Sequence, residues 1–377
     1  MGSIDKKLFT PGPLNCSLST KEAMLKDLGS RDETFIQTVS DVRRELLEIA
    51  GVSEHDWTAV LIQGSGTYAV EAVLQTSTPR GDGRVLILAN GAYGLRMETM
   101  CKVADLEFDS IRSSEILPFN ISQVEAQLTN GKVYTTVCIV HCETSSGVIN
   151  NVEEVAELVR KHQPLAFMFV DAMSSFGAIP LGLTNIDFLV SSANKCLQGV
   201  PGFAYAICRK QCLAKCAGNS RSLSLDLEHQ ERNMIETRQF RFTPPTHTIL
   251  AFKQALQEFK AEGGLQGRGD RYAANCQIMK RGMIKLGFKS LVKDEYASNI
   301  ISCFFYPDHE NFKFKTFYTA LSDKGEIIYP GKVTDSQCFR IGNIGDLHKQ
   351  DMDRLLVSVE AVLKEMEIPV PVPGPVL

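Results

Sequence analysis

The sequence predicts an α/β protein, with a mostly parallel, doubly wound sheet in a large domain and a smaller α+β C-terminal domain. Between residues 58 and 210, short apolar runs such as "RVLILAN" and "LAFMFVD" alternate with segments of helical periodicity. Runs this continuously apolar are typical of strands that are buried on both faces, as in parallel sheets. Alternation of such strands with helices indicates right-handed βαβ units.

The N-terminal third is expected to begin with irregular chain and helices. The stretch "LFTPGPL" has two prolines around Gly12, so it can be neither helix nor central strand. Ser19 followed by Glu22 is typical of a helix start, and apolar residues at helical spacing predict a helix over 32–50. We then expect strands within 58–63, 84–90, 135–141, 165–171, 187–194 and 203–210, and helices within 68–74, 95–103 and 152–162.

The C-terminal third predicts a smaller unit. A long helix is expected over 247–262, ended by Gly263 and Gly264. Strand-like segments follow in "NIISCFFYP", "EIIYPG" and "CFRIG", with helices over 312–325 and 349–365. The predicted organisation is an N-terminal arm (1–20), a large ligand-binding domain (21–255), a small C-terminal domain (256–367) and a flexible proline-rich tail (368–377).

Composition excludes several classes of function. The 377 residues are 44% hydrophobic and 22% charged, with a net charge of −4, which is ordinary for a globular protein. We expect no nucleic-acid partner, because no basic patch stands out, and no membrane span, because no apolar run approaches about 20 residues. Eleven scattered cysteines without a CxxC motif indicate reduced thiols and no zinc site. With no apolar leader visible, we expect a cytoplasmic protein.

Candidate ligand-binding residues follow the predicted strands, because ligands of open α/β sheets bind beyond the strands' carboxyl ends. "GSGT" separates the first strand from a helix, and its Ser65, Gly66 and Thr67 can bind a phosphate through hydroxyls and backbone N–H groups. It lacks the lysine of a Walker A loop and the third glycine of GxGxxG. A plain tight turn is the alternative interpretation.

Four further positions at strand ends carry chemistry. Tyr93 can stack on a flat ring or simply cover the core. Hydroxyls cluster at 144–146, where loop solvation is the alternative. Asp171 directly follows an apolar strand and needs a partner, although it can also cap the segment "AMSSFG". Lys195 comes at the end of the next strand, among small residues that include Ser192.

Together, these residues match the needs of pyridoxal 5′-phosphate (PLP). Lys195 would form a Schiff base with the cofactor's aldehyde, and a low-dielectric site would lower its pKa. Asp171 would face the pyridine nitrogen and keep it protonated, so that the ring can take up electrons. Arg340 in "CFRIGNIG" offers a forked donor set for the acidic end of a substrate; a surface salt bridge is the alternative.

Longer stretches carry a family resemblance over nearly the whole chain: "TPGPL", "QGSGTYAVEA", "NGAYGLR", "HCETSSGV", "VDAMSSFGAIP", "SSANKCLQGVPGF", "SRSLSLDL", "RFTPPTHT", "YPGKV" and "FRIGNIG". The chain resembles the class V aminotransferases, which are fold-type I PLP-dependent enzymes. The resemblance implies transfer of the amino group of 2-aminoethylphosphonate to pyruvate, giving phosphonoacetaldehyde and L-alanine in phosphonate catabolism. One departure is "HCETSSG", which has serines where the family has threonines.

The resemblance also implies roles for individual residues. Lys195 and Asp171 would be catalytic, Arg340 would bind the substrate, and Thr144 would contact the hydroxyl side of the cofactor ring. Cofactor contacts would further come from Ser65, Gly66, Thr67, Tyr93 and Ser192. The family forms homodimers, so Thr246 or Thr243 of one subunit would reach the phosphate in the other.

Rival functions remain open from the sequence. An alanine–glyoxylate or serine–pyruvate aminotransferase would share the lysine, the aspartate and the arginine. A PLP lyase or desulfurase would need a mobile catalytic cysteine, and no cysteine lies in a suitable glycine-rich loop. A non-catalytic relative would not need both Lys195 and Asp171. A nicotinamide dehydrogenase lacks its third glycine and an acidic residue placed for ribose.

Overall fold

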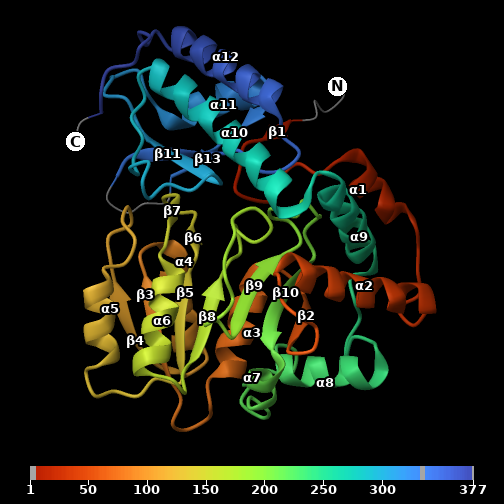
Figure 1. The fold of residues 1–377 in the computed structure, drawn as a ribbon. Coiled ribbons are helices and arrows are strands. Elements are labelled where there is room, and N and C mark those ends of the chain that lie inside the picture. The colour runs from red at the N-terminus through yellow and green to blue at the C-terminus, as the bar shows by residue number, and fades with distance from the viewer. Residues whose placement is uncertain (1–5, 332–335, 376–377) are drawn as a thin grey trace.

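A seven-stranded sheet forms the centre of the computed structural model, which describes residues 6–331 and 336–375 (Figure 1). The strands run in the order β2–β10–β9–β8–β5–β3–β4. They are β2 (Trp57–Gln63), β3 (Arg84–Ala89), β4 (Glu107–Arg112), β5 (Thr136–Val140), β8 (Phe167–Asp171), β9 (Phe188–Ser192) and β10 (Phe203–Arg209). β10 runs in the direction opposite to that of the other six strands, which are parallel to one another. The predicted mostly parallel sheet is therefore confirmed.

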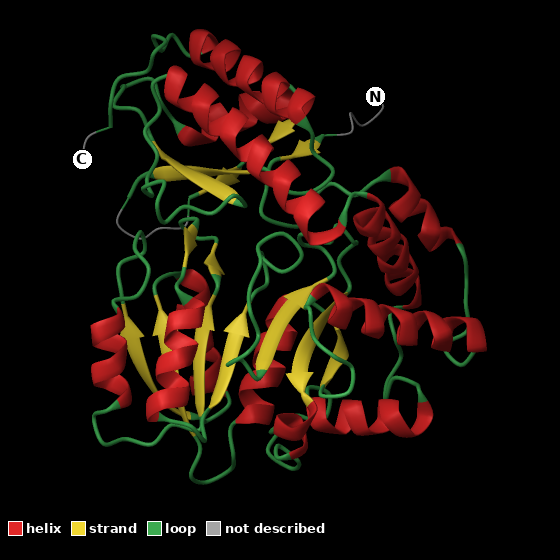
Figure 2. Ribbon diagram, viewed as in Figure 1, coloured by secondary structure: helices red, strands yellow, loops and turns green. Residues whose placement is uncertain are grey.

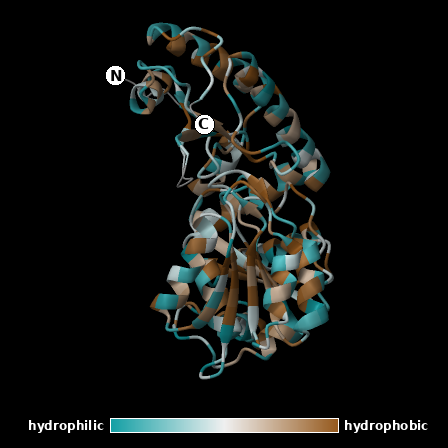
Figure 3. Ribbon diagram, turned by 90° about the vertical axis from the view of Figure 1, so that its left-hand side faces the viewer, coloured by the Kyte–Doolittle hydropathy of each residue, from teal (hydrophilic) through white to brown (hydrophobic). Residues whose placement is uncertain are grey.

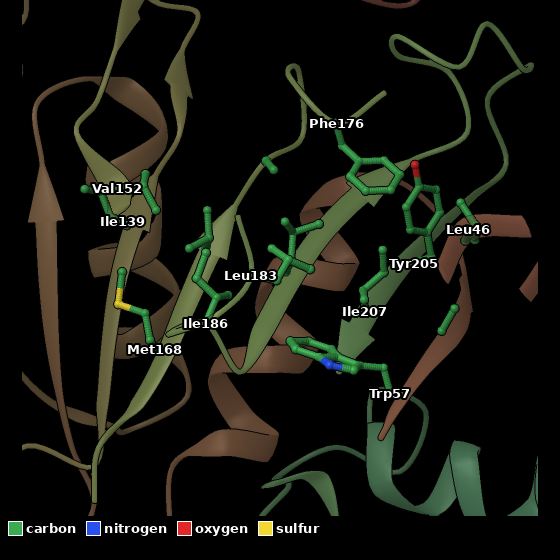
Figure 4. Packing of buried hydrophobic residues seen from close by; sticks show 14 of the residues in the cluster. Leu46, Trp57, Ile139, Val152, Met168, Phe176, Leu183, Ile186, Tyr205 and Ile207 are labelled. Carbon is green, nitrogen blue, oxygen red and sulfur yellow. The ribbon is translucent and has the colours of Figure 1, made fainter. Parts of the chain in front are cut away.

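Helices cover both faces of this sheet, as Figure 3 shows from the side. One face packs against α2 (Glu33–Ile49), α5 (Ile121–Leu128), α6 (Val152–His162) and α9 (Thr246–Ala261), and the other against α3 (Gly66–Ser77), α4 (Ala92–Val103) and α7 (Lys210–Ala214). Along β3, Leu86 and Leu88 point to the first core, and Val85 and Ile87 to the second. Figure 4 shows part of the first core. Burial of both faces explains the long apolar runs of the inner strands such as β3.

The first helices differ slightly from expectation. Asp32 caps α2, its carboxylate accepting the Thr34 N–H at 2.8 Å, as the helix predicted over 32–50 requires. However, α1 (Leu18–Glu22) is capped by Ser17, whose hydroxyl accepts the Thr20 N–H at 3.1 Å. The predicted start at Ser19 is therefore wrong. A short 3₁₀ helix (Ala23–Leu25) follows α1.

A second, smaller sheet lies above the first (Figure 2). Its order is β11–β14–β13, with β11 (Ile301–Phe305), β13 (Tyr329–Pro330) and β14 (Cys338–Gly342). Its apolar core is shared with α10 (Gly264–Lys285), α11 (Phe314–Asp323) and α12 (Lys349–Glu365). The N-terminal β1 (Lys7–Leu8) pairs with β12 (Glu326–Ile327) beside this sheet. Two further elements are the hairpin β6 (Cys142–Glu143) with β7 (Val148–Ile149), and α8 (Leu227–Thr237).

Two of the predicted domain limits need correction. The boundary at 255/256 falls inside α9, yet Leu256 and Phe259 of α9 still pack in the core of the large sheet. The tail was expected to be flexible, but Ile368 and Val372 are buried in the small-sheet core, and the Val372 N–H donates to the Leu286 carbonyl at 2.8 Å. Apolar side chains between the prolines explain this packing.

The described part of the chain contains no helix with both the length and the apolar character needed to cross a membrane. Residues Lys332 and Val333 of "YPGKV" lie outside the described ranges.

Candidate active site

A cavity of about 180 Å³ lies beyond the carboxyl ends of the parallel strands. Its wall brings together residues that are far apart in the sequence, because β2, β3, β8 and β9 all end at this edge. Seven of the predicted site residues line it: Ser65, Gly66, Thr67, Tyr93, Asp171, Ser192 and Lys195. The other five lining residues are Val70, Arg96, Met100, Met173 and Asn194.

One part of the wall is a cradle for an anion. Ser65 occupies the N-cap of α3, but its side chain makes no capping hydrogen bond, and the first two residues of the helix, Gly66 and Thr67, line the cavity. A Cβ on Gly66 would lie 2.3 Å from the Met173 sulfur, so a larger residue would require the Met173 side chain to move. Gly64 has φ +113°, which turns the chain from β2 into the helix. The cradle suits a phosphate group.

Asp171 places a carboxyl group in the middle of the wall. It ends β8, is 4% exposed, and its Oδ1 accepts the Met173 N–H at 2.9 Å. Asp171 therefore has both of the roles that the sequence suggested. Its carboxyl group caps the turn that follows it, and it also lines the cavity. Burial raises the pKa of Asp171 to about 6, against the opposing effects of the Met173 N–H and of Lys195. A positive charge brought to this wall would favour the ionised carboxylate.

Lys195 follows β9 and directs its amine into the same cavity. Burial lowers the pKa of the amine, although the neighbouring Asp171 opposes this effect. Nζ donates to the Pro11 carbonyl at 3.0 Å. A lowered pKa leaves more of the amine neutral and nucleophilic near neutral pH.

The N-terminal "TPGPL" segment covers Lys195, which sequence reasoning did not anticipate. Gly12 has φ +126°, and a Cβ there would lie 2.6 Å from Lys195 Nζ. The two prolines indicated irregular chain, but nothing in the local sequence indicated where this segment packs. The segment shields the amine from bulk water.

Arg96 is a second residue that the prediction missed. It lies one turn after Tyr93 on α4, with its guanidinium carbon 4.9 Å from the Tyr93 ring centre. Its Nη1 donates to the Thr67 hydroxyl at 3.4 Å. Arg96 therefore adds a positive charge next to the anion cradle, and it lowers the pKa of both Asp171 and Lys195. The three-residue spacing from Tyr93 in "NGAYGLR" was the available signal.

Glu143, in the β6–β7 hairpin, holds the start of α4 against this edge. The residue is fully buried, which raises its pKa. Its Oε1 accepts the Ser145 hydroxyl at 2.6 Å and its Oε2 accepts the Tyr93 N–H at 3.3 Å. It therefore fixes the backbone that carries Tyr93.

Arg340 and Thr144 do not line the 180 Å³ cavity but meet each other between the two sheets. Arg340, on β14, is 1% exposed; its Nη1 donates to the Thr144 carbonyl at 2.6 Å and its Nε to the Pro330 carbonyl at 2.8 Å. A surface salt bridge is therefore the wrong interpretation for this residue. Its guanidinium carbon also lies 4.9 Å from the ring centre of Tyr329.

Thr246 begins α9 and does not contribute to the cavity wall of its own chain. The segment before it lies beside the end of β2, because Gln63 Nε2 donates to the Thr243 carbonyl at 3.1 Å. Thr243 is exposed and Thr246 half-buried. Their contact with a second subunit stays a prediction.

Comparison with known proteins gives consistent matches. Residues 18–331 match the family model described as aminotransferase class-V. The chain is 44% identical over 362 residues to a 2-aminoethylphosphonate–pyruvate transaminase of Phocaeicola vulgatus, covering 95% of this chain and 99% of the relative. It is 46% identical over 364 residues to the protein of that name from Klebsiella pneumoniae subsp. pneumoniae, covering 96% and 98%.

Solved structures show the same fold at lower identity. A ureidoglycine–glyoxylate aminotransferase from Bacillus subtilis superposes with a TM-score of 0.88 at 20% identity, covering 98% of this chain and 96% of that one. An alanine–glyoxylate aminotransferase from Nostoc superposes with a TM-score of 0.87 at 23% identity, covering 96% of each chain.

Proposed function

Because the chain belongs to the aminotransferase class-V family, we propose that it transfers the amino group of 2-aminoethylphosphonate to pyruvate with PLP as cofactor. The products are phosphonoacetaldehyde and L-alanine. The observation that carries the proposal is the meeting of Lys195, Asp171 and an anion cradle in one cavity. The choice of substrates is supported by relatives of that name that match over nearly their whole length.

The residues of the cavity fit PLP. The phosphate would be held by the first-turn N–H groups of α3 and the hydroxyls of Ser65, Thr67 and Ser192, with Arg96 adding charge. Tyr93 would stack on the ring, and the buried Asp171 would meet the pyridine nitrogen. When bound, PLP supplies an aldehyde that accepts the amino group and a protonated ring that accepts electrons.

The chain's own groups handle the proton transfers. Lys195 Nζ, whose pKa is lowered by burial, would take a proton from the carbon that bears the donor nitrogen and later give it up again. The ionised Asp171 would stabilise a proton on the ring nitrogen of the bound cofactor. The Pro11 carbonyl orients Nζ, and the "TPGPL" segment limits the access of water.

Arg340 would bind the phosphonate of the donor and the carboxylate of pyruvate in turn. Its guanidinium is oriented by the carbonyls of Thr144 and Pro330, so it is preorganised for a forked contact. Arg340→Lys keeps the charge but loses the fork. We expect it to raise KM for both substrates by roughly 10- to 100-fold, which is the usual loss for a charge-assisted hydrogen bond.

Steady-state kinetics with each substrate varied in turn would measure this effect. Arg354→Lys is the matched control, because Arg354, on α12, pairs with Glu326 of β12 and does not line the cavity. Unchanged KM values for both substrates in Arg340→Lys would remove Arg340 from the anion site.

The protein is expected to act as a homodimer in the cytoplasm. In the dimer, Thr246 or Thr243 of one subunit would complete the phosphate site of the other. Support comes from apolar side chains left exposed beside the cradle and the "TPPTHT" segment, namely Tyr68 and Phe242.

A panel of amino donors tests the proposed reaction. Purified holoenzyme is incubated with pyruvate and either 2-aminoethylphosphonate or L-serine, and alanine formation is measured; alanine is also tested with glyoxylate. We expect the phosphonate to be the preferred donor. Activity with alanine and glyoxylate but none with the phosphonate would favour the alanine–glyoxylate or serine–pyruvate alternative. Sulfide release from cysteine would favour a desulfurase.

A further inference from the structure

A second cavity, of about 460 Å³, lies on the α2 and α6 side of the large sheet. It is bordered by the end of α2, the loop of residues 176–183 and the start of α10. It shares no lining residue with the 180 Å³ cavity, although Ala172 lines one cavity and its neighbours Asp171 and Met173 the other. We call it the α2–α10 cavity, and nothing in the transamination described above uses it.

The walls of the α2–α10 cavity are mainly apolar. Phe176 and Leu183, labelled in Figure 4, extend the large-sheet core into its floor. At the rim, Ile49, Leu181 and Leu265 are only partly buried, although they pack against that core. Covering such surface with an apolar molecule is favourable, because it removes apolar area from water. The volume also falls within the usual range of small-molecule sites.

One largely buried side chain of the cavity wall, His141, has a ring nitrogen without a protein partner. His141 is 4% exposed, and its Nδ1 makes a 2.9 Å hydrogen bond with the Ser175 hydroxyl. Within residues 6–331 and 336–375, no group bonds its Nε2. Burial lowers the pKa of His141 to about 4, so the ring is neutral near pH 7. Because His141 lines the cavity, this nitrogen can form a hydrogen bond with a polar group of a bound molecule.

A second polar group lies at the rim. Glu153 accepts the Gly182 N–H at 2.8 Å, which closes the loop of residues 176–183 onto α6. A Cβ on Gly182 would lie 2.9 Å from that carboxylate oxygen, so glycine permits this closure. The loop that roofs the cavity is thus held in place by a specific contact.

We propose that the α2–α10 cavity binds a small, largely apolar molecule whose single hydroxyl or amine group pairs with His141 Nε2. The molecule would contact the side chains of Phe176, Leu183 and Leu265, and it would take no part in the transamination reaction. Because the two cavities share no lining residue, binding here and transamination are separable in experiment.

Calorimetric titration of the holoenzyme with 4-ethylphenol tests this proposal. We expect saturable binding of one molecule per chain, unchanged when pyruvate saturates the active site. Leu265→Trp fills the rim and should weaken binding at least tenfold without changing transaminase activity. The matched control is Leu165→Trp, since Leu165 is 92% exposed and outside the cavity, and it should bind as wild type.

The role of His141 is tested with a second probe. His141→Leu should weaken binding of 4-ethylphenol about tenfold, but binding of toluene, which has no hydrogen-bonding group, less than twofold. Absence of saturable binding, displacement by pyruvate, or wild-type affinity in Leu265→Trp would each overturn the proposal. Equal loss of both probes in His141→Leu would exclude the pairing with Nε2.

Discussion

Replacing Lys195 by alanine is expected to lower turnover of 2-aminoethylphosphonate and pyruvate by about 10⁴-fold or more. Lys195 lines the cavity and is the residue proposed both to hold the cofactor and to carry the proton. The side chain makes one hydrogen bond, to the Pro11 carbonyl, and burial disfavours its charged form, so its removal should not unfold the chain. Alanine formation under saturating substrates is the measurement.

The matched control is Lys210→Ala, because Lys210 is exposed and lies outside the cavity. It should retain wild-type turnover. Thermal unfolding of both variants checks that the fold is kept. Lys195→Ala with more than about a hundredth of wild-type turnover would contradict a covalent and proton-carrying role for this amine.

Asp171→Asn is expected to lower turnover by about 10²- to 10³-fold, because a neutral amide cannot stabilise positive charge on the ring nitrogen. The amide oxygen can still accept the Met173 N–H, so the local turn is kept. Asp171→Glu, which restores the charge, should recover part of the activity. Turnover equal to wild type in Asp171→Asn would remove the proposed pairing.

The same variant should change how stability depends on pH in the cofactor-free protein. The pKa of Asp171 is raised from 3.8 to about 6, so the folded chain holds this proton more tightly than the unfolded chain does. This tighter binding adds at most about 3 kcal/mol to the free energy of unfolding. The contribution is fully present below pH 4 and is lost as the pH rises through 6. Asp171→Asn lacks this loss and should be the more stable protein at pH 8.

Urea unfolding at pH 4 and pH 8 measures that difference. From pH 4 to pH 8, the free energy of unfolding of the wild type should fall relative to that of Asp171→Asn. If the free energy of unfolding changed equally in the two proteins, the carboxyl group would not be desolvated as the structure indicates.

Elements with strong local patterns were predictable from the sequence, and those shaped by their surroundings were not. The helices over 152–162 and 349–365 match α6 and α12 as observed. The edge strand β4, "EFDSIR", is polar and half-exposed, so it lacks the apolar run that marked the other strands. The helix α10 was not predicted, and it contains Gly269, where a Cβ would lie 2.7 Å from the Ala178 carbonyl oxygen. Glycine at this position therefore allows α10 to pack closely against the backbone at Ala178.

Some residues of the candidate site could be predicted from the sequence, and others could not. Asp171 and Lys195 were recognisable because an acidic and a basic side chain followed apolar strands whose ends must share one edge. Pro11 and Gly12 were not recognisable as part of the site, because their contact with Lys195 joins residues 184 positions apart. Arg340 was predicted to bind the substrate, which stays a prediction, but its anchoring by Thr144 and Pro330 depends on how the two sheets meet. Sequence order does not specify that arrangement.

The central claim, a lysine-linked cofactor facing Asp171, is tested most directly by reduction of the purified yellow holoprotein with sodium borohydride. Borohydride fixes a lysine-linked PLP to the chain, and mass spectrometry of the peptides then locates it. The account predicts a single phosphopyridoxyl group, on the peptide that contains Lys195. A group fixed to another lysine, or none fixed at all, would contradict it.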